Sequence, residues 1–335
     1  LVWQDAMNLV TDIKYNADSN GGNISFKVDR SSIRQGNAVI AIKDVSDAIL
    51  WSWHVWVTDE DINNVIEITN HQNVKYNFMP VNLGQCDGNT ITYEERSCKV
   101  KFIAGDQSKE ITIKQLANVI ATGSNAPFYQ WGRKDPLYPS NGMGNTTKIW
   151  YDKEGIPSTA NPMKGTFSAG NDCIKNCILN PNLMHNRYNG DYTYYNLWSA
   201  DNKTTSANDN PVNKTIYDPC PVGFKLPASN AFTGFTTTGE SVSSSTQVNG
   251  TWSSSEKGWY FYTNSEKTQS IFFPALGYRS YSTMRPGSIG TQGCFWSAHP
   301  VAKGNNYYLR TSSVDVQPTY MVDRGFGYAL RPCQD

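Results

Sequence analysis

Cysteine is the residue type with the most chemistry to offer in this chain of 335 residues, which contains seven. Cys220 lies in residues 217–227, where three prolines and a glycine exclude a helix and indicate a rigid corner. Near the end of the printed sequence, residues 325–333 are expected to form a short strand that ends in Cys333. We predict a disulfide between Cys220 and Cys333, worth roughly 4–5 kcal/mol on the chain-entropy model for so long a loop.

The remaining cysteines suggest further pairings. Cys86 and Cys98 bracket a polar segment and form the natural local pair, whereas zinc would need a second close cysteine or histidine pair. Cys173 and Cys177 would share one face of a helix, a spacing unlike that of redox C-x-x-C motifs and poorly placed for a mutual disulfide. One of them would then form a disulfide elsewhere, with Cys294 as a candidate partner. Because the number of cysteines is odd, one of the seven would remain unpaired in a monomer.

Metal sites are not expected from the other ligand types, and no cofactor is indicated. The segment 201–213 is rich in oxygen ligands for calcium, but its spacing fits no calcium loop that we can name, which favours a solvated loop. The residues concerned are Asp201, Asn208, Asp209 and Asn210. His54 lies among tryptophans, and we expect it to be a packed or hydrogen-bonded structural residue.

Composition narrows the class of protein. The formal net charge is zero and 17% of residues are charged, which removes the electrostatic case for nucleic acid or an anionic membrane as partner. No apolar run approaches the roughly 18–20 residues of a membrane span. Ten Trp, nineteen Tyr and thirteen Phe favour strands, and also suit adhesive surfaces. The cysteine content suits an oxidising compartment, and we expect a processed, extracellular product.

Strand patterns dominate residues 1–122, which we interpret as a β-sandwich domain. Alternation over residues 49–58 predicts a core face formed by Trp51, Trp53, Val55 and Val57. Residues 98–103 and 110–115 flank Gly105-Asp106-Gln107, which is a hairpin signature.

A second domain is expected over residues 123–335. It contains the best helix candidate, residues 171–179 with Pro181 as the stop, a short helical turn near residues 230–235, and a series of short strands. Residues 277–293 form a long loop of the kind that is usually functional or mobile. The expected fold class is therefore mainly β with minor α.

Five segments of the sequence carry a resemblance to a known family: residues 78–84 (Phe-Met-Pro-Val-Asn-Leu-Gly), 129–136 (Tyr-Gln-Trp-Gly-Arg-Lys-Asp-Pro), 217–223 (Tyr-Asp-Pro-Cys-Pro-Val-Gly), 252–254 (Trp-Ser-Ser) and 327–332 (Gly-Tyr-Ala-Leu-Arg-Pro). Together they resemble the C-type-lectin-like "major paralogous domain" of surface proteins from Gram-negative gut anaerobes. Residues 36–41 and 49–58 look like the part that precedes it in fimbrillin-like adhesins. In those relatives the first two motifs lie close together, whereas here residues 85–128 separate them.

The resemblance implies a surface-anchored or fimbrial role, at the outer membrane or at a pilus tip, and a C-type-lectin-like fold for residues 123–335. It implies other pilus subunits, or a surface glycan or protein, as partners. The sequence lacks the Glu-Pro-Asn, Gln-Pro-Asp and Trp-Asn-Asp elements of calcium-dependent sugar binders. A glycan would therefore be bound by aromatic stacking with polar loop groups, for which the candidate residues are Trp259, Tyr260, Tyr278, Arg279, Tyr281 and Arg285.

Two alternatives to a non-catalytic adhesin remain. One is a purely structural pilus subunit that assembles by adding a strand to a neighbour's sheet edge. The other is an enzyme related to the sulfatase-modifying branch of the same fold, in which Cys294 and His299 would act as nucleophile and base. An accessible Cys294 thiol of low pKa would favour that enzyme.

Overall fold

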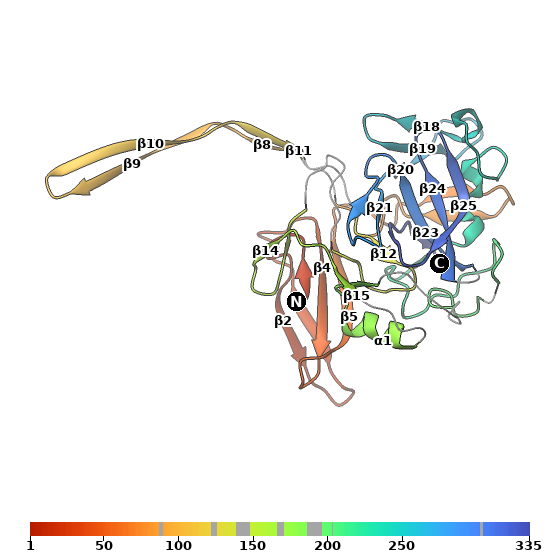
Figure 1. The fold of residues 1–335 in the computed structure, drawn as a ribbon, viewed down its shortest axis with the longest axis horizontal. Helices are drawn as coiled ribbons and strands as arrows, with labels where there is room; N and C mark the ends of the chain where they lie inside the picture. The colour runs from red at the N-terminus through yellow and green to blue at the C-terminus, as the bar shows by residue number, and fades with distance from the viewer. Residues whose placement is uncertain are drawn as a thin grey trace.

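The computed structural model describes residues 1–86, 90–121, 126–138, 148–165, 171–185, 196–202, 204–301 and 304–335, with the backbone alone at 90–93, 118–121 and 171. The chain is mainly β with minor α, as expected. Figure 1 shows two bodies side by side, one built around the N-terminal strands and one around the C-terminal strands, and a long two-stranded arm that extends away from both.

The N-terminal body is a five-stranded sheet with a hairpin beside it. The strand order of the sheet is β14-β13-β1-β4-β5. These strands are β1 (Trp3–Gln4), β4 (Gly36–Lys43), β5 (Ile49–Val57), β13 (Trp150–Tyr151) and β14 (Pro157–Ser158). The hairpin consists of β2 (Thr11–Asn16) and β3 (Asn23–Lys27) and packs through Ile13 and Ile24 against the core residues of β4.

The C-terminal body contains four larger sheets or ribbons. Their orders are β17-β27-β7-β6, β12-β26-β21-β22, β18-β19-β20 and β23-β24-β25. The strands are β6 (Ile66–Thr69), β7 (Lys75–Phe78), β12 (Tyr129–Gln130), β17 (Phe224–Lys225), β18 (Gly250–Ser253), β19 (Gly258–Tyr262), β20 (Ser270–Pro274), β21 (Tyr278–Arg279), β22 (Pro286–Gly287), β23 (Gly293–Pro300), β24 (Asn305–Thr311), β25 (Val316–Asp323), β26 (Gly327–Tyr328) and β27 (Cys333–Gln334).

Helical structure is confined to short pieces. The α-helix α1 spans Asn171–Leu179, which confirms the predicted helix, and the 3-10 helices η1 and η2 span Ser229–Phe235 and Ser245–Gln247. A parallel pair, β15 (Met163–Gly165) with β16 (Leu183–His185), flanks α1 in the sequence. None of the described helices is long and apolar enough to cross a membrane.

Aromatic rings fill the core of the C-terminal body. Phe235 and Phe261 stack with their ring centroids 3.9 Å apart, and Phe273 meets Phe235 edge-on at 5.0 Å. Phe78, from near the N-terminal part of the chain, stacks on Phe232 at 5.6 Å. Offset and edge-to-face geometry of this kind adds to the burial energy of the rings.

The sheets do not divide at residue 122, where the sequence suggested a domain boundary. β6 and β7 precede that point but pair within the C-terminal body, where Phe78 lies opposite Cys333. β13 and β14 follow it but extend the N-terminal sheet, where Tyr151 lies opposite Gln4. The chain therefore crosses between the two bodies more than once, which a single linker in the sequence did not reveal.

Strand β5 joins the two bodies through the face that was expected to point away from the core. Ser52 on this face is 1% exposed, whereas Trp53 on the predicted core face is 42% exposed, so that prediction is wrong for these residues. Ser52 Oγ donates to Asp135 Oδ1 at 2.9 Å, and Lys134 Nζ lies 2.7 Å from Asp135 Oδ2 in a buried ion pair. Ser52 is buried because it is a hydrogen-bond partner of the buried Lys134–Asp135 ion pair.

His54 on the same strand is structural, as expected. Its Nε2 lies 2.9 Å from Asn37 Oδ1, and its Nδ1 lies 2.9 Å from the hydroxyl of Tyr129. A neutral ring that donates from Nε2 and accepts at Nδ1 satisfies both partners. Burial lowers the pKa of His54 to about 3, which keeps the ring in that neutral form.

Candidate functional site

Residues 90–121 form an arm that extends away from the rest of the described chain. It consists of β8 (Thr90–Tyr93) paired with β11 (Asn118–Ala121), followed by β9 (Arg96–Ala104) paired with β10 (Gln107–Gln115). Gly105 takes a φ of +62° in the turn, so the predicted hairpin is confirmed. From residue 94 to residue 117, every residue except Val100 is exposed.

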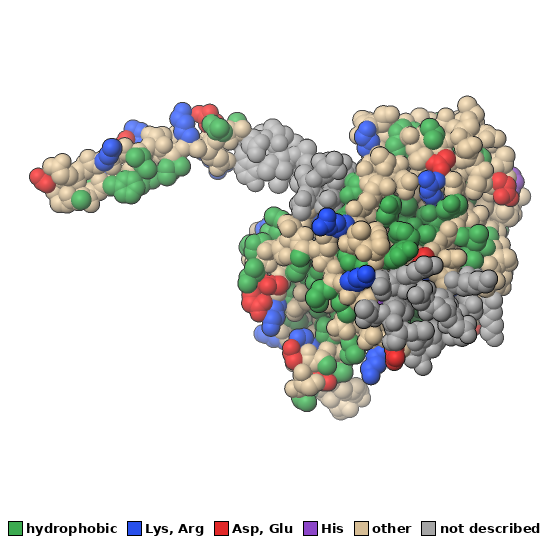
Figure 2. All heavy atoms as spheres, in the orientation of Figure 1, with side chains coloured by type: hydrophobic (Ala, Val, Ile, Leu, Met, Phe, Trp, Pro, Cys, Tyr) green, Lys and Arg blue, Asp and Glu red, His purple; other side chains and the backbone are tan. Residues whose placement is uncertain are grey.

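The two faces of the arm differ in chemistry. The pairing places Val100 opposite Ile111 and Cys98 opposite Ile113, with Phe102 next along the same face, opposite Lys109 at its end. On the opposite face, Lys99 and Glu110 form an ion pair at 2.9 Å. Figure 2 shows hydrophobic side chains gathered along one side of the arm and charged side chains along the other.

The apolar face of the arm, defined as Cys98, Val100, Phe102, Ile111 and Ile113, is uncovered. Phe102 is 57% exposed, Ile111 42% and Ile113 52%. A two-stranded ribbon is marginally stable by itself in water, and exposed contiguous apolar surface usually marks an interaction site. The arm therefore has the composition of a binding element.

Two of the six residues predicted to bind a ligand are in the core instead. Trp259 is 1% exposed and its Nε1 donates to the carbonyl of Ser312 at 2.7 Å. Arg279 is also 1% exposed and donates to Asn161 Oδ1 at 2.8 Å and to the carbonyl of Met284 at 2.7 Å. Neither side chain is available to stack on a glycan, so the prediction is wrong for both.

The other four predicted ligand residues reach the surface at two places. Tyr260 is half-buried on β19, and its hydroxyl donates to Glu256 Oε1 at 2.8 Å. Tyr278 and Tyr281 are half-buried and contact Phe326 edge-on at 5.5 Å and 4.7 Å. Arg285 is exposed. Tyr278 and Tyr281 thus form an aromatic cluster with Phe326, a residue that the sequence pattern did not indicate.

The predicted disulfides are absent, because none of the seven cysteines is bonded to another. Cys86 is buried, whereas Cys98 is exposed on β9 of the arm. The two cysteines are therefore separated from each other. Cys220 and Cys333 do lie in neighbouring segments, as expected, but backbone pairing between β17 and β27 joins them. Burial raises the pKa of Cys333 to about 12 and that of Cys220 well above its usual value.

Cys294 and His299 do not form a nucleophile and base. Cys294 is 1% exposed, and burial raises its pKa to about 12, so the thiol is neither accessible nor activated. His299 faces a different partner, with its Nδ1 3.2 Å from the hydroxyl of Ser229. Ser229 and His299 are both fully buried, so this pair has no access to a substrate.

Asp209 connects separate elements of the fold through hydrogen bonds. Asp209 Oδ1 accepts hydrogen bonds from Asn70 Nδ2 at 2.6 Å and from the Tyr76 hydroxyl at 2.7 Å, and its Oδ2 accepts one from Asn230 Nδ2 at 2.9 Å. These bonds tie the β6–β7 connection to η1. The Asp209 carboxylate is therefore part of a hydrogen-bond network within the fold, whereas the sequence suggested a solvated loop.

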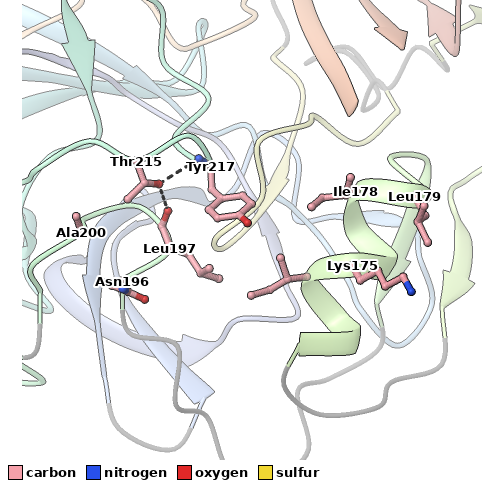
Figure 3. A pocket seen from close by; sticks show the side chains of 9 residues that line it. Lys175, Ile178, Leu179, Asn196, Leu197, Ala200, Thr215 and Tyr217 are labelled. Carbon is pink, nitrogen blue, oxygen red and sulfur yellow. Dashed lines mark hydrogen bonds between the residues drawn. The ribbon is translucent and has the colours of Figure 1, made fainter. Parts of the chain in front are cut away.

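A pocket of about 530 Å³ lies between α1 and residues 196–217. Its lining is mainly aliphatic and includes Ile174. Ile178 from α1 lies across the space from Leu197 and Tyr217 (Figure 3). The Thr215 hydroxyl already donates to the carbonyl of Leu197 and accepts from the amide of Tyr217. The pocket therefore presents few polar groups that could orient a ligand.

Comparison with protein-family models, with curated protein sequences and with solved structures finds no match to this chain.

Proposed function

We propose that this protein is a non-catalytic subunit of a cell-surface fibre or adhesin that associates with a neighbouring subunit through the apolar face of its arm. The observation that carries the proposal is the exposure of Phe102, Ile111 and Ile113 on one face of a ribbon that extends from the body. The resemblance of the sequence motifs to fimbrillin-like adhesins supports the extracellular, fimbrial setting.

A second copy of this chain is the partner that the arm fits most simply. The apolar face is the same on both copies, so two arms can pack face to face in a self-complementary contact. Residues 94–117 carry five basic and four acidic side chains, so two arms do not repel each other strongly. Full burial of each Val, Ile or Phe side chain contributes about 1.5–3 kcal/mol.

The experiment is sedimentation velocity over a range of protein concentrations. The wild-type chain is expected to self-associate, and the variant Phe102→Ser/Ile111→Ser is expected to remain monomeric with an unchanged melting temperature. Ile103→Ser is the matched control, because Ile103 is 69% exposed but lies on the opposite face of β9. Association that survives the double substitution would overturn the proposal.

The purely structural subunit remains the second candidate, and the same arm supports it. In the adhesin, the surface around Tyr278 and Tyr281 would contact a glycan or protein ligand in addition. Binding of the full chain to a broad glycan array, with Tyr281→Ala as the comparison, separates the two. Binding that is lost in the variant supports the adhesin, and the absence of any binding supports the structural subunit or a protein ligand.

A further inference from the structure

Three potential metal ligands converge outside the arm. Cys173 and Cys177 lie one turn apart on α1, and His185 ends β16. One ligand atom from each of the three residues lies within 4.8 Å of the other two. Cys173 and His185 are buried and Cys177 is half-buried, so the cluster is largely screened from water.

The donor set selects the kind of ion. Two cysteine sulfurs and an imidazole nitrogen are soft to borderline ligands, which favour Zn²⁺ over calcium or magnesium. In a tetrahedral zinc site with bonds of about 2.0–2.3 Å, neighbouring ligand atoms are about 3.3–3.8 Å apart. The ligand atoms of the three residues, all within 4.8 Å of one another, are near enough to reach that spacing with small side-chain adjustments. A disulfide between cysteines on adjacent turns of one helix would be poorly oriented by comparison.

The backbone of His185 is held in place by β12 and by the segment that follows it. The side chain of Gln130 binds both backbone groups of His185, donating to its carbonyl at 2.8 Å and accepting from its amide at 3.0 Å. Arg133 donates to the carbonyl of Leu183, the first residue of β16, and to that of Pro181, in the connection from α1 to β16. Such outer contacts orient the ligands of metal sites.

A glycine leaves room for the ring. Gly165 lies directly opposite His185 in the parallel β15–β16 pair. A Cβ atom at position 165 would lie 3.0 Å from Nδ1 of His185, closer than ordinary van der Waals contact. The absence of a side chain there allows the imidazole to lie close to Gly165, beside the two thiols.

We propose that Cys173, Cys177 and His185 bind one Zn²⁺ ion, with water in the fourth position. The ion would connect α1, which carries the two cysteines, to the β15–β16 pair, which carries His185. The site does not depend on the function proposed for the arm. Binding replaces the two thiol protons, which are released to solvent as the ion binds.

The test is equilibrium dialysis of the reduced full chain against ZnCl₂, followed by metal analysis. One Zn²⁺ per chain is expected, together with a higher melting temperature in the presence of zinc. Co²⁺ in place of Zn²⁺ should give a thiolate-to-metal charge-transfer band. Cys173→Ser/Cys177→Ser should lose the metal and the band, whereas the control Cys98→Ser, which alters an exposed cysteine far along the arm, should keep both.

Two results would overturn the proposal. One is zinc retained equally by the Cys173→Ser/Cys177→Ser variant. The other is a wild-type chain that binds no zinc when thiol titration shows every cysteine to be reduced. If the double variant fails to fold, the single variant Cys177→Ser, at the half-buried cysteine, decides: a weakened charge-transfer band supports the proposal, and an unchanged band overturns it.

Discussion

The side chain of Gln130 forms hydrogen bonds with both backbone polar groups of His185. Its Nε2 donates to the carbonyl of His185 at 2.8 Å, and its Oε1 accepts from the amide of His185 at 3.0 Å. The same Nε2 donates to the carbonyl of Gly325 at 2.7 Å. One buried amide thus connects β12, β16 and the segment before β26. The sequence motif at residues 129–136, which contains Gln130, therefore has a structural role in joining these three segments.

Removal of this amide should destabilise the fold. Gln130→Ala leaves the backbone groups of His185 and the carbonyl of Gly325 buried without these partners, each at a cost of about 1–3 kcal/mol. We expect the free energy of unfolding in urea to fall by at least about 3 kcal/mol. Gln107→Ala, at the exposed start of β10, is the control and should change it by no more than about 0.5 kcal/mol. Equal effects of the two substitutions would contradict this role.

Arg331 should be similarly important. It is 1% exposed, and its guanidinium donates to Asn82 Oδ1 at 2.7 Å, to the carbonyl of Pro80 at 2.7 Å and to that of Phe272 at 2.7 Å. Arg331→Met should lower the free energy of unfolding by at least about 3 kcal/mol, because it leaves these acceptors unsatisfied. Arg285→Met, at an exposed arginine, is the matched control. A melting temperature that does not distinguish the two variants would refute the expectation.

Acid should destabilise the protein through His54. Its pKa is about 3 in the folded state, against 6.5 as the ordinary value, so the unfolded chain binds the proton more readily. The stabilising contribution is therefore complete above pH 6.5 and is lost as the pH falls toward 3. Between pH 7 and pH 5 the loss is about 2 kcal/mol.

The difference between wild type and His54→Gln isolates this contribution from the other titrating groups. Urea unfolding of both chains at pH 7 and pH 5 should show that the substitution reduces the loss of stability on acidification by about 2 kcal/mol. Parallel pH profiles for the two chains would mean that His54 is not held neutral by burial.

Local signals in the sequence predicted local structure correctly. The helix at residues 171–179, the turn near residue 230 and the hairpin around Gly105 follow from patterns over a few neighbouring residues. The sequence also indicated that Cys173 and Cys177 would share a helix face. It did not indicate His185, because the parallel pairing of β15 with β16 brings that residue to the two cysteines.

Burial was harder to predict, because it depends on what covers a strand. Val100, Phe102, Ile111 and Ile113 alternate as core residues of a sheet do, yet they line an arm with nothing packed on that face in the described structure. Conversely, Trp259 and Arg279 suggested a binding surface but fill the core. Ser52 is buried because Asp135, eighty-three positions away in the sequence, accepts its hydrogen bond.

Photocrosslinking at neighbouring positions of β9 tests the arm contact most directly. A benzoylphenylalanine at position 102 would lie on the apolar face, and the same residue at position 103 would lie on the opposite face. We expect irradiation to link two copies of the chain from position 102, through residues 98–113 of the partner, and to give little product from position 103. Equal yields from the two positions, or no dimer from position 102, would contradict the proposal that the apolar face binds a second subunit of this kind.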